Sequence, residues 1–444
     1  MKKKIQFLAL FLSAFIEKHR KYLFIGIFFG LTTTLLLLQI YPYYKESINV
    51  KVEKIGLIGK FSENNLPLSV RNKISLGITS LSPSGEATSS LAYSWTIKSN
   101  GLSYVFQLLD NLYWHDGKKF VADDVSYKLK DITFSPLSKN TVEVILKEPY
   151  APILTNLSYP LMKPGLVGLG LYQTEKIKYS QDYISEIVLR PYKKNLPILN
   201  YKFYENTKEA ILAFKMGEIN KLEQLSNLED LNDLKSIQVF QYSLYDRIVA
   251  VFLNLKNPYF KEKEVRQALN YAVPSFPDFE KAYTPISPFS WAYSNKIRLY
   301  KYDPETAQKI LSKTILASSS SEITISTYAS TIETAQKIAD GWNKIGIKSK
   351  IKVESLIPSD YQAFLLTFQV PSDPDQYQFW QSTQEDTNIT HYTNLKIDKL
   401  LEDGRKTLDK DTRKKIYADF QRYLVDDSPV IFLYFPKAYT VERK

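Results

Sequence analysis

The chain has 444 residues, of which 44% are hydrophobic and 14% aromatic, enough apolar material for two or three lobes with cores of their own. It contains no cysteine, which excludes disulfides, thiolate metal sites, cysteine nucleophiles and a lipid anchor attached to cysteine. The net charge is +11, but six Lys/Arg and one Glu before residue 22 supply +5 of it. Because the rest of the chain has no compact basic block, we expect no nucleic-acid partner.

The N-terminal segment predicts a membrane anchor. Residues 1–21 are basic, and residues 22–41 form an uncharged run of 20 residues, the length that a helix needs to cross the hydrocarbon core. The positive-inside rule then places the N-terminus in the cytoplasm and the rest of the chain, from residue 42, outside, as in a single-pass protein of the cell membrane. A cleaved signal peptide is the alternative, although no small-x-small cleavage site follows the apolar run.

A strand, a turn and a capped helix are predicted in succession after residue 100. Alternating apolar side chains predict a strand over residues 104–108. Asp116 and the glycine after it predict a turn. Asp123 and Asp124 precede spaced apolar residues, which predicts a helix that begins there, since a carboxylate accepts from the free N–H groups of a first turn.

Most other elements follow from hydrophobic periodicity. In chain order, the pattern predicts a strand at 52–58, a strand at 141–146, and helices at 153–161 and 209–221. It then predicts a buried strand at 248–255, a helix at 264–273, a proline-rich loop up to residue 291 and a helix at 303–311. The segments 322–328, 331–345 and 349–353 predict a strand, helix and strand with parallel pairing. The chain ends with helices at 397–406 and 412–425 and a strand at 430–435.

Short motifs in a fixed order give a more specific indication. They are Trp114 to Gly117, Phe120 to Val125, Lys147 to Pro152, Gly168 to Tyr172, Val265 to Ala272, Trp291 to Tyr293, Asp373 to Asp375 and Pro429 to Tyr434. Together they resemble the motifs of extracytoplasmic solute-binding proteins of the peptide/nickel class, the dipeptide- and oligopeptide-binding components of ABC importers. The resemblance extends over roughly residues 70 to 436.

The resemblance implies an α/β fold of the type II periplasmic-binding-protein kind, with two lobes and a reduced extra subdomain. The implied parts are a stalk and first strand at 42–69, an N-terminal lobe at 70–250 with its subdomain at about 90–163, a second lobe at 251–428, and a return strand to the first lobe at 429–444. Relative to many members, the chain is trimmed after Tyr127 and after Ala272, which predicts a roomier or shallower cleft.

The resemblance also places a ligand site around residues 364–380. Asp373 and Pro374 set the register, and three positions earlier the family's peptide binders carry an Asp that pairs with the ligand's ammonium. Here that position is Val370, so the identity of the ligand is open. The candidate ligand-binding residues are Thr367, Gln369, Asp373, Tyr377, Trp380, Trp291 and Tyr293. For the aromatic ones, packing in a core is the alternative.

Enzyme signatures are poor. Of the three histidines, His115 lies in the predicted turn, and no Gly-x-Ser-x-Gly or His-Glu-x-x-His sequence occurs. We therefore expect a binding protein with no catalytic residues, no metal and no cofactor. The resemblance implies that it delivers a peptide or a similar small polar solute to ABC importer permease subunits. A ligand sensor on the same fold, or less favourably a surface hydrolase, is the alternative.

Overall fold

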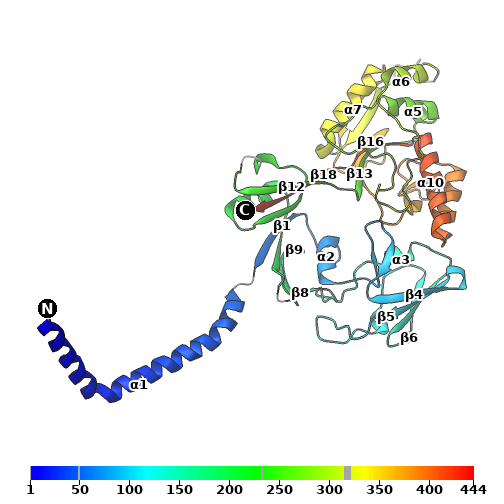
Figure 1. The fold of residues 1–444 in the computed structure, drawn as a ribbon. Helices are drawn as coiled ribbons and strands as arrows, with labels where there is room; N and C mark the ends of the chain where they lie inside the picture. The colour runs from blue at the N-terminus through cyan, green and yellow to red at the C-terminus, as the bar shows by residue number, and fades with distance from the viewer. Residues whose placement is uncertain (1, 49–50, 194, 232–233, 315–321) are drawn as a thin grey trace.

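The computed structural model describes residues 2–48, 51–193, 195–231, 234–314 and 322–444. Helix α1 (Lys2–Ile48) projects away from the sheets and is visibly bent (Figure 1). Within the described residues, no single helix is long and apolar enough to cross a membrane. Two helical segments, Ser13–Tyr22 and Phe24–Gln39, are bent by 61° relative to each other. Taken together, they have the length and apolar composition of a membrane span.

The first lobe is built on a seven-stranded sheet in the order β12-β18-β11-β1-β10-β9-β8. Its strands are β1 (Val52–Ile58), β8 (Tyr172–Ser180), β9 (Tyr183–Pro191), β10 (Ile198–Tyr204), β11 (Lys221–Leu225), β12 (Ile237–Ser243) and β18 (Lys437–Arg443). Strand β1 has the predicted bounds and pairs in parallel with β10 and β11. Helices α2 (Leu68–Ile74) and α4 (Thr207–Met216) contribute their buried residues to two cores beside this sheet.

A small subdomain carries a four-stranded antiparallel sheet in the order β4-β5-β7-β6. Its strands are β4 (Ala92–Lys98), β5 (Ser103–Leu108), β6 (Ile132–Ser138) and β7 (Thr141–Leu146), next to the hairpin β2 (Thr79–Leu81) and β3 (Ala87–Ser89) and the short helix α3 (Ile153–Asn156). The strands predicted at 104–108 and 141–146 are thus confirmed, whereas the helix predicted at 153–161 is only four residues long.

The helix predicted from Asp123 is wrong. Only one 3-10 turn forms, over Ala122–Asp124, and Val125 is already extended. The Asp124 carboxylate accepts hydrogen bonds from Val121 N and from Trp114 Nε1, both at 3.0–3.1 Å. It caps a single turn and ties that turn to the strand region before it, and the chain then continues in extended form.

The second lobe contains a five-stranded sheet in the order β15-β14-β16-β13-β17. Its strands are β13 (Arg247–Leu253), β14 (Glu322–Thr327), β15 (Lys348–Val353), β16 (Ala363–Gln369) and β17 (Val430–Tyr434), and its helices are α5 (Lys263–Tyr271), α6 (Pro304–Leu311), α7 (Ile332–Lys344), α8 (Tyr377–Trp380), α9 (Leu395–Lys406) and α10 (Lys410–Asp427). Strands β14 and β15 are connected by α7 and pair in parallel, as predicted.

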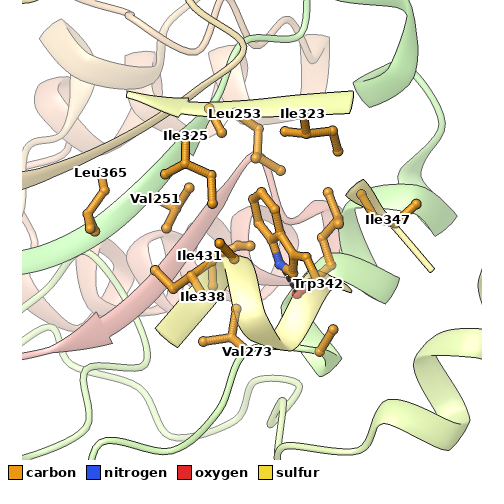
Figure 2. Close-up of a cluster of buried hydrophobic side chains, with 14 of the residues drawn as sticks. Val251, Leu253, Val273, Ile323, Ile325, Ile338, Trp342, Ile347, Leu365 and Ile431 are labelled. Carbon is orange, nitrogen blue, oxygen red and sulfur yellow. Dashed lines mark hydrogen bonds between the residues drawn. The ribbon is translucent and has the colours of Figure 1, made fainter. Parts of the chain in front are cut away.

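Strand β13 is buried on both faces, which confirms the prediction from its continuous apolar run. Alternate residues of β13 enter two different cores: one with α5, α6 and α7, the other with α9 and α10. Figure 2 shows the first of these cores, where Trp342 packs among aliphatic side chains and donates from Nε1 to the Leu269 carbonyl at 3.0 Å.

Two chain crossings join the lobes. One runs from β12 to β13, the other from β17 to β18, and Leu244 N donates to the Pro436 carbonyl between them at 2.8 Å. The segment 429–444, expected to return to the first lobe as a whole, contributes one strand to each lobe. Strand β17 belongs to the second sheet, and β18 alone joins the first, because the buried residues of β17 pair with β13.

Candidate ligand-binding site

A cavity of about 860 Å³ lies between the lobes. The first lobe lines it with α2 and the chain up to Leu81, the small subdomain with segments between Tyr127 and Tyr159, and the second lobe with residues 371–378 and Arg405. Its ionic lining residues are Lys128, Asp373, Asp375 and Arg405. The cavity is therefore formed by all three sheet-bearing parts of the molecule.

Asp373 forms a buried, bidentate ion pair. It follows β16, and its two carboxylate oxygens accept from Arg413 Nη1 at 3.0 Å and Arg413 Nη2 at 2.5 Å. Arg413 is 5% exposed and also donates from Nε to the Gly404 carbonyl at 2.7 Å. From the subdomain, Thr155 Oγ1 donates to the same carboxylate at 3.3 Å. This geometry holds the Asp373 carboxylate in place at the point where the lobes meet.

Asp375 forms a second pair, with Arg405. Its Oδ2 accepts from Arg405 Nη2 at 2.9 Å and from Nε at 3.2 Å. The guanidinium lies 4.1 Å from the ring centre of Tyr377 and 5.2 Å from that of Tyr150. Burial raises the pKa of Asp375, and Arg405 opposes that rise. Since Tyr150 belongs to the subdomain and Tyr377 to the second lobe, Arg405 contacts both sides of the cavity.

Tyr127 of the subdomain also lines the cavity. Its hydroxyl accepts from Ile78 N at 3.1 Å and is directed at the carbonyls of Leu157 and Tyr159 at 3.0 and 3.1 Å. Burial raises the pKa of Tyr127 well above its ordinary value, so the phenol stays neutral and remains a hydrogen-bond donor. The other polar residues on the cavity surface include Asn72, Ser80, Ser90, Asn156 and Gln378.

The predicted site residues fall into two groups. Asp373 lines the interlobe cavity, and Tyr377 holds the arginine that lines it. Trp291 lines an adjoining cavity of about 200 Å³ together with Asp373 and Arg413, whose guanidinium lies 5.5 Å from the Trp291 ring centre. The structure therefore brings Trp291, Asp373 and Tyr377 to the junction of the lobes.

The other predicted residues do not line the interlobe cavity. Trp380 is fully buried and stacks on Phe252 in the second-lobe core, with ring centres 6.0 Å apart. Tyr293 packs, partly buried, against the same core. Thr367 and Gln369 are exposed on β16. For Thr367 and Gln369 the placement differs from the prediction because strand alternation fixes two faces but does not show which of them faces a ligand.

Two further positions clarify the site. Val370, the position at which the resemblance predicts the amine-pairing group, is buried in the second-lobe core. The ring of His115 accepts from Gly168 N at 3.2 Å through Nδ1, and its Nε2 lies 3.1 Å from the Gly170 carbonyl. Burial lowers the pKa of His115, which favours this neutral form and a structural role in the turn.

Sequence reasoning missed Tyr127, Tyr150 and Arg405. Tyr127 was assigned to the helix that does not form, and Arg405 follows Tyr150 by more than half the chain. The pairing of Asp375 with Arg405 leaves no local trace, because its two partners come from a loop after β16 and from the last turn of α9. The one usable signal was the pair of acidic residues, Asp373 and Asp375, directly after a buried strand.

Two α/β lobes joined by two crossings, with a cavity between them, define the class of type II periplasmic binding proteins. The model of the bacterial extracellular solute-binding proteins, family 5 (middle region), matches residues 86–389. The chain belongs to this family, the peptide/nickel class of ABC-importer solute-binding proteins, which confirms the resemblance seen in the sequence.

Individual relatives cover most of the chain. The oligopeptide-binding protein AppA of Bacillus subtilis is 25% identical, with 86% of each chain covered. The structure of NikZ from Campylobacter jejuni in complex with Ni(L-His) has a TM-score of 0.73 and 25% identity, and covers 88% of this chain and 94% of its own. CtaP from Listeria monocytogenes, at 19% identity and a TM-score of 0.76 over 89% of this chain and 94% of its own, supports the fold.

Proposed function

We propose that the protein is a membrane-anchored, extracytoplasmic substrate-binding protein of an ABC importer, which holds a peptide or a similar small polar solute between its lobes and delivers it to permease subunits. The observation that carries this proposal is the cavity of about 860 Å³ with lining residues from both lobes and the subdomain. Its volume lies in the upper part of the range usual for small-molecule sites, about 300–1,000 Å³.

The charges of the cavity favour a particular ligand chemistry. Both lining carboxylates, Asp373 and Asp375, already pair with arginines, and the resemblance predicts Val370 at the position of the amine-pairing Asp of peptide binders. A free ammonium on the ligand therefore gains no strong partner from these groups. Lys128 is exposed at the cavity and offers an ammonium to an acidic group. The ligand that fits best is a peptide or solute whose amino end is blocked or absent and which carries one carboxylate.

The anchor is supported by α1. Its segment Phe24–Gln39 has no charged residue, and basic residues precede it. With its partner segment it reaches the length and apolarity of a membrane span, and the positive-inside rule would leave both lobes outside the cytoplasm. Protease added to intact cells should then digest the lobes, and alkaline washing should leave the chain in the membrane fraction. Release by the wash would contradict the anchor.

Binding would act by a shift between open and closed arrangements of the lobes. The two crossings are the covalent links between the sheets, so closure can take place about them. The ligand favours the closed form by the difference between its affinities for the two forms. Under this proposal the ligand is not converted chemically, and the chain would release the same molecule that it bound.

The proposal is tested with the full chain in lipid nanodiscs. Di- to tetrapeptides with free or acetylated amino ends are titrated by calorimetry, and the bound ligand is recovered and weighed by mass spectrometry. We expect acetylated peptides to bind at least as tightly as free ones, and to be recovered intact. Recovery of cleaved peptide would instead support a hydrolase. Tight binding without uptake in cells that carry the cognate permease would support a sensor.

Arg405→Lys is the informative variant, because it keeps the charge but loses the planar contacts with Asp375, Tyr150 and Tyr377. We expect the dissociation constant to rise about tenfold. Arg422→Ala is the matched control, since Arg422 forms an exposed pair with Asp419 on α10, and its removal should leave binding unchanged.

A further inference from the structure

A second cavity, of about 340 Å³, lies in the second lobe and shares no lining residue with the interlobe cavity. The loop after α5, the segment before α6 and Leu433 of β17 surround it. Most of its lining is apolar or aromatic: Val273, Phe276, Phe279, Tyr283, Leu299, Tyr300, Tyr302 and Leu433. Such a volume accommodates a small molecule.

Aromatic rings form a rigid support under this cavity. Phe279 stacks on Tyr434 with ring centres 4.2 Å apart, and Phe276 lies 5.1 Å from the same ring. The Tyr434 hydroxyl is held by Thr334 Oγ1 at 2.7 Å. By contrast, Tyr283, Leu299 and Tyr302 are 39%, 51% and 39% exposed. Apolar surface is thus available for a ligand over a fixed aromatic base.

Lys281 lines this cavity and a smaller adjoining one. Its backbone pairs with Tyr434 as an additional bridge at the edge of the sheet, and its Nζ donates to the Phe432 carbonyl at 2.8 Å. Burial lowers the pKa of Lys281 to about 8. The ammonium can donate three hydrogen bonds, so the single carbonyl leaves further capacity for an acceptor.

The two cavities around Lys281 are lined by cations and not by carboxylates among the described residues. The described residues that line the two cavities include no Asp or Glu. Their titratable side chains, besides Lys281, are Tyr283, Arg298, Tyr300, Lys301 and Tyr302. Arg298 is already paired with Asp426 at 3.1 Å. A partly buried ammonium without a counter-ion is unfavourable, and an anion from outside would remove that penalty.

We propose that this cavity is a second ligand site, in which a small aromatic or apolar carboxylate places its carboxylate on the Lys281 ammonium and its apolar part among Phe276, Tyr283 and Tyr302. The site is independent of the interlobe cavity, and the proposal stands whether or not that cavity binds peptides.

The test uses the full chain in nanodiscs, with empty nanodiscs as the blank, and calorimetric titration with phenylacetate and indole-3-acetate. Phenylacetamide, the uncharged analogue, measures the contribution of the carboxylate. We expect the amide to bind at least about tenfold more weakly than phenylacetate. Phenylacetate affinity should also fall as the pH rises above about 8, where Lys281 loses its proton.

Four variants locate the binding. Lys281→Met should weaken phenylacetate at least about tenfold, whereas Lys281→Arg, which keeps the cation, should retain it within about threefold. Lys309→Met, which removes an exposed lysine on α6, should leave phenylacetate affinity unchanged. Arg405→Lys, which weakens the ligand of the interlobe cavity, should likewise leave phenylacetate affinity unchanged, because Arg405 does not line the second cavity.

Three results would overturn the proposal: no binding of either carboxylate up to about 10 mM, equal binding of phenylacetate and its amide, or binding that depends on Arg405 rather than Lys281. Thermal unfolding of Lys281→Met without ligand shows whether the variant is folded, and Lys281→Arg carries the test if it is not.

Discussion

The two cavities differ in how their ionic side chains are paired. In the interlobe cavity, Asp373 and Asp375 each bind an arginine of the same lobe. In the second-lobe cavity, Lys281 has a carbonyl as its hydrogen-bond partner and no lining carboxylate. Asp373 and Asp375 are thus neutralised before a ligand arrives, so the ionic contact that the first cavity offers a ligand is with the exposed Lys128. In the second cavity an anion would meet the partly buried Lys281. Selectivity should depend more on shape and neutral hydrogen bonds in the first cavity and more on charge in the second.

The largest effect is expected from breaking a pair in the first cavity. Arg413→Ala leaves the buried Asp373 carboxylate without its bidentate partner, and should lower the free energy of unfolding by about 3–5 kcal/mol, measured by urea denaturation. Arg422→Ala on the same helix removes an exposed pair and should change it by less than about 0.5 kcal/mol. If the two variants lowered the free energy of unfolding equally, the ion pair between Arg413 and Asp373 would contribute no more to stability than an exposed pair.

In the second cavity, we expect a substitution to raise the free energy of unfolding instead of lowering it. Lys281→Met removes a charge that burial disfavours, and should raise the free energy of unfolding by about 3 kcal/mol at pH 7. Below pH 8 the lysine is charged in both the folded and the unfolded chain, so the penalty is full there. It declines as the pH rises from about 8 towards the ordinary value of 10.5, and the difference from the unchanged protein should disappear above it. A variant that is destabilised at pH 7 would contradict the unpaired state of Lys281.

A smaller effect is expected from a neutral group of the interlobe cavity. Tyr127→Phe removes the hydroxyl that accepts from Ile78 N and bonds the carbonyls of the α3 region. The free energy of unfolding should fall by about 1 kcal/mol, because the buried amide loses its partner. Amide hydrogen exchange at Ile78 should accelerate. Unchanged exchange would mean that water replaces the hydroxyl at this position.

The smallest effect concerns an exposed pair between the lobes. Lys410 of α10 bonds Glu86 between β2 and β3, and both side chains are more than 40% exposed. Lys410→Ala should alter the free energy of unfolding by less than about 0.5 kcal/mol. The hydrogen bond from Lys410 lowers the pKa of Glu86, with a smaller contribution from Ser84, so an NMR titration of Lys410→Ala should show that pKa moving up towards its ordinary value. No movement would show that the pair does not persist in solution.

Local pattern predicted the strands better than the connections. The bounds of β1 and β7 match the strands predicted at 52–58 and 141–146, and the strand, helix and strand at 322–353 follow from a change of period. The helix expected from Asp123 failed because its cap is drawn into a contact with Trp114, which precedes it by several residues and a turn. Tertiary partners of this kind override a capping signal.

The interlobe site was predicted only in part, for a related reason. Asp373 could be placed because it follows a buried strand within a family motif. Arg405 and Tyr127 could not, since their roles depend on how α9 and the subdomain approach each other across the cavity. Trp380 shows the converse, because an aromatic residue in the same motif fills a core instead of a ligand site.

The position of β18 has a consequence for folding during translation. This strand, residues Lys437–Arg443, is the last in the chain, yet it sits inside the seven-stranded sheet between β12 and β11. The sheet of the first lobe therefore lacks its strand between β12 and β11 until the ribosome has synthesised the whole second lobe. A chain cut before Lys437 would leave β12 without its neighbour in the sheet, so we expect proteases to degrade it faster than a chain that includes β18.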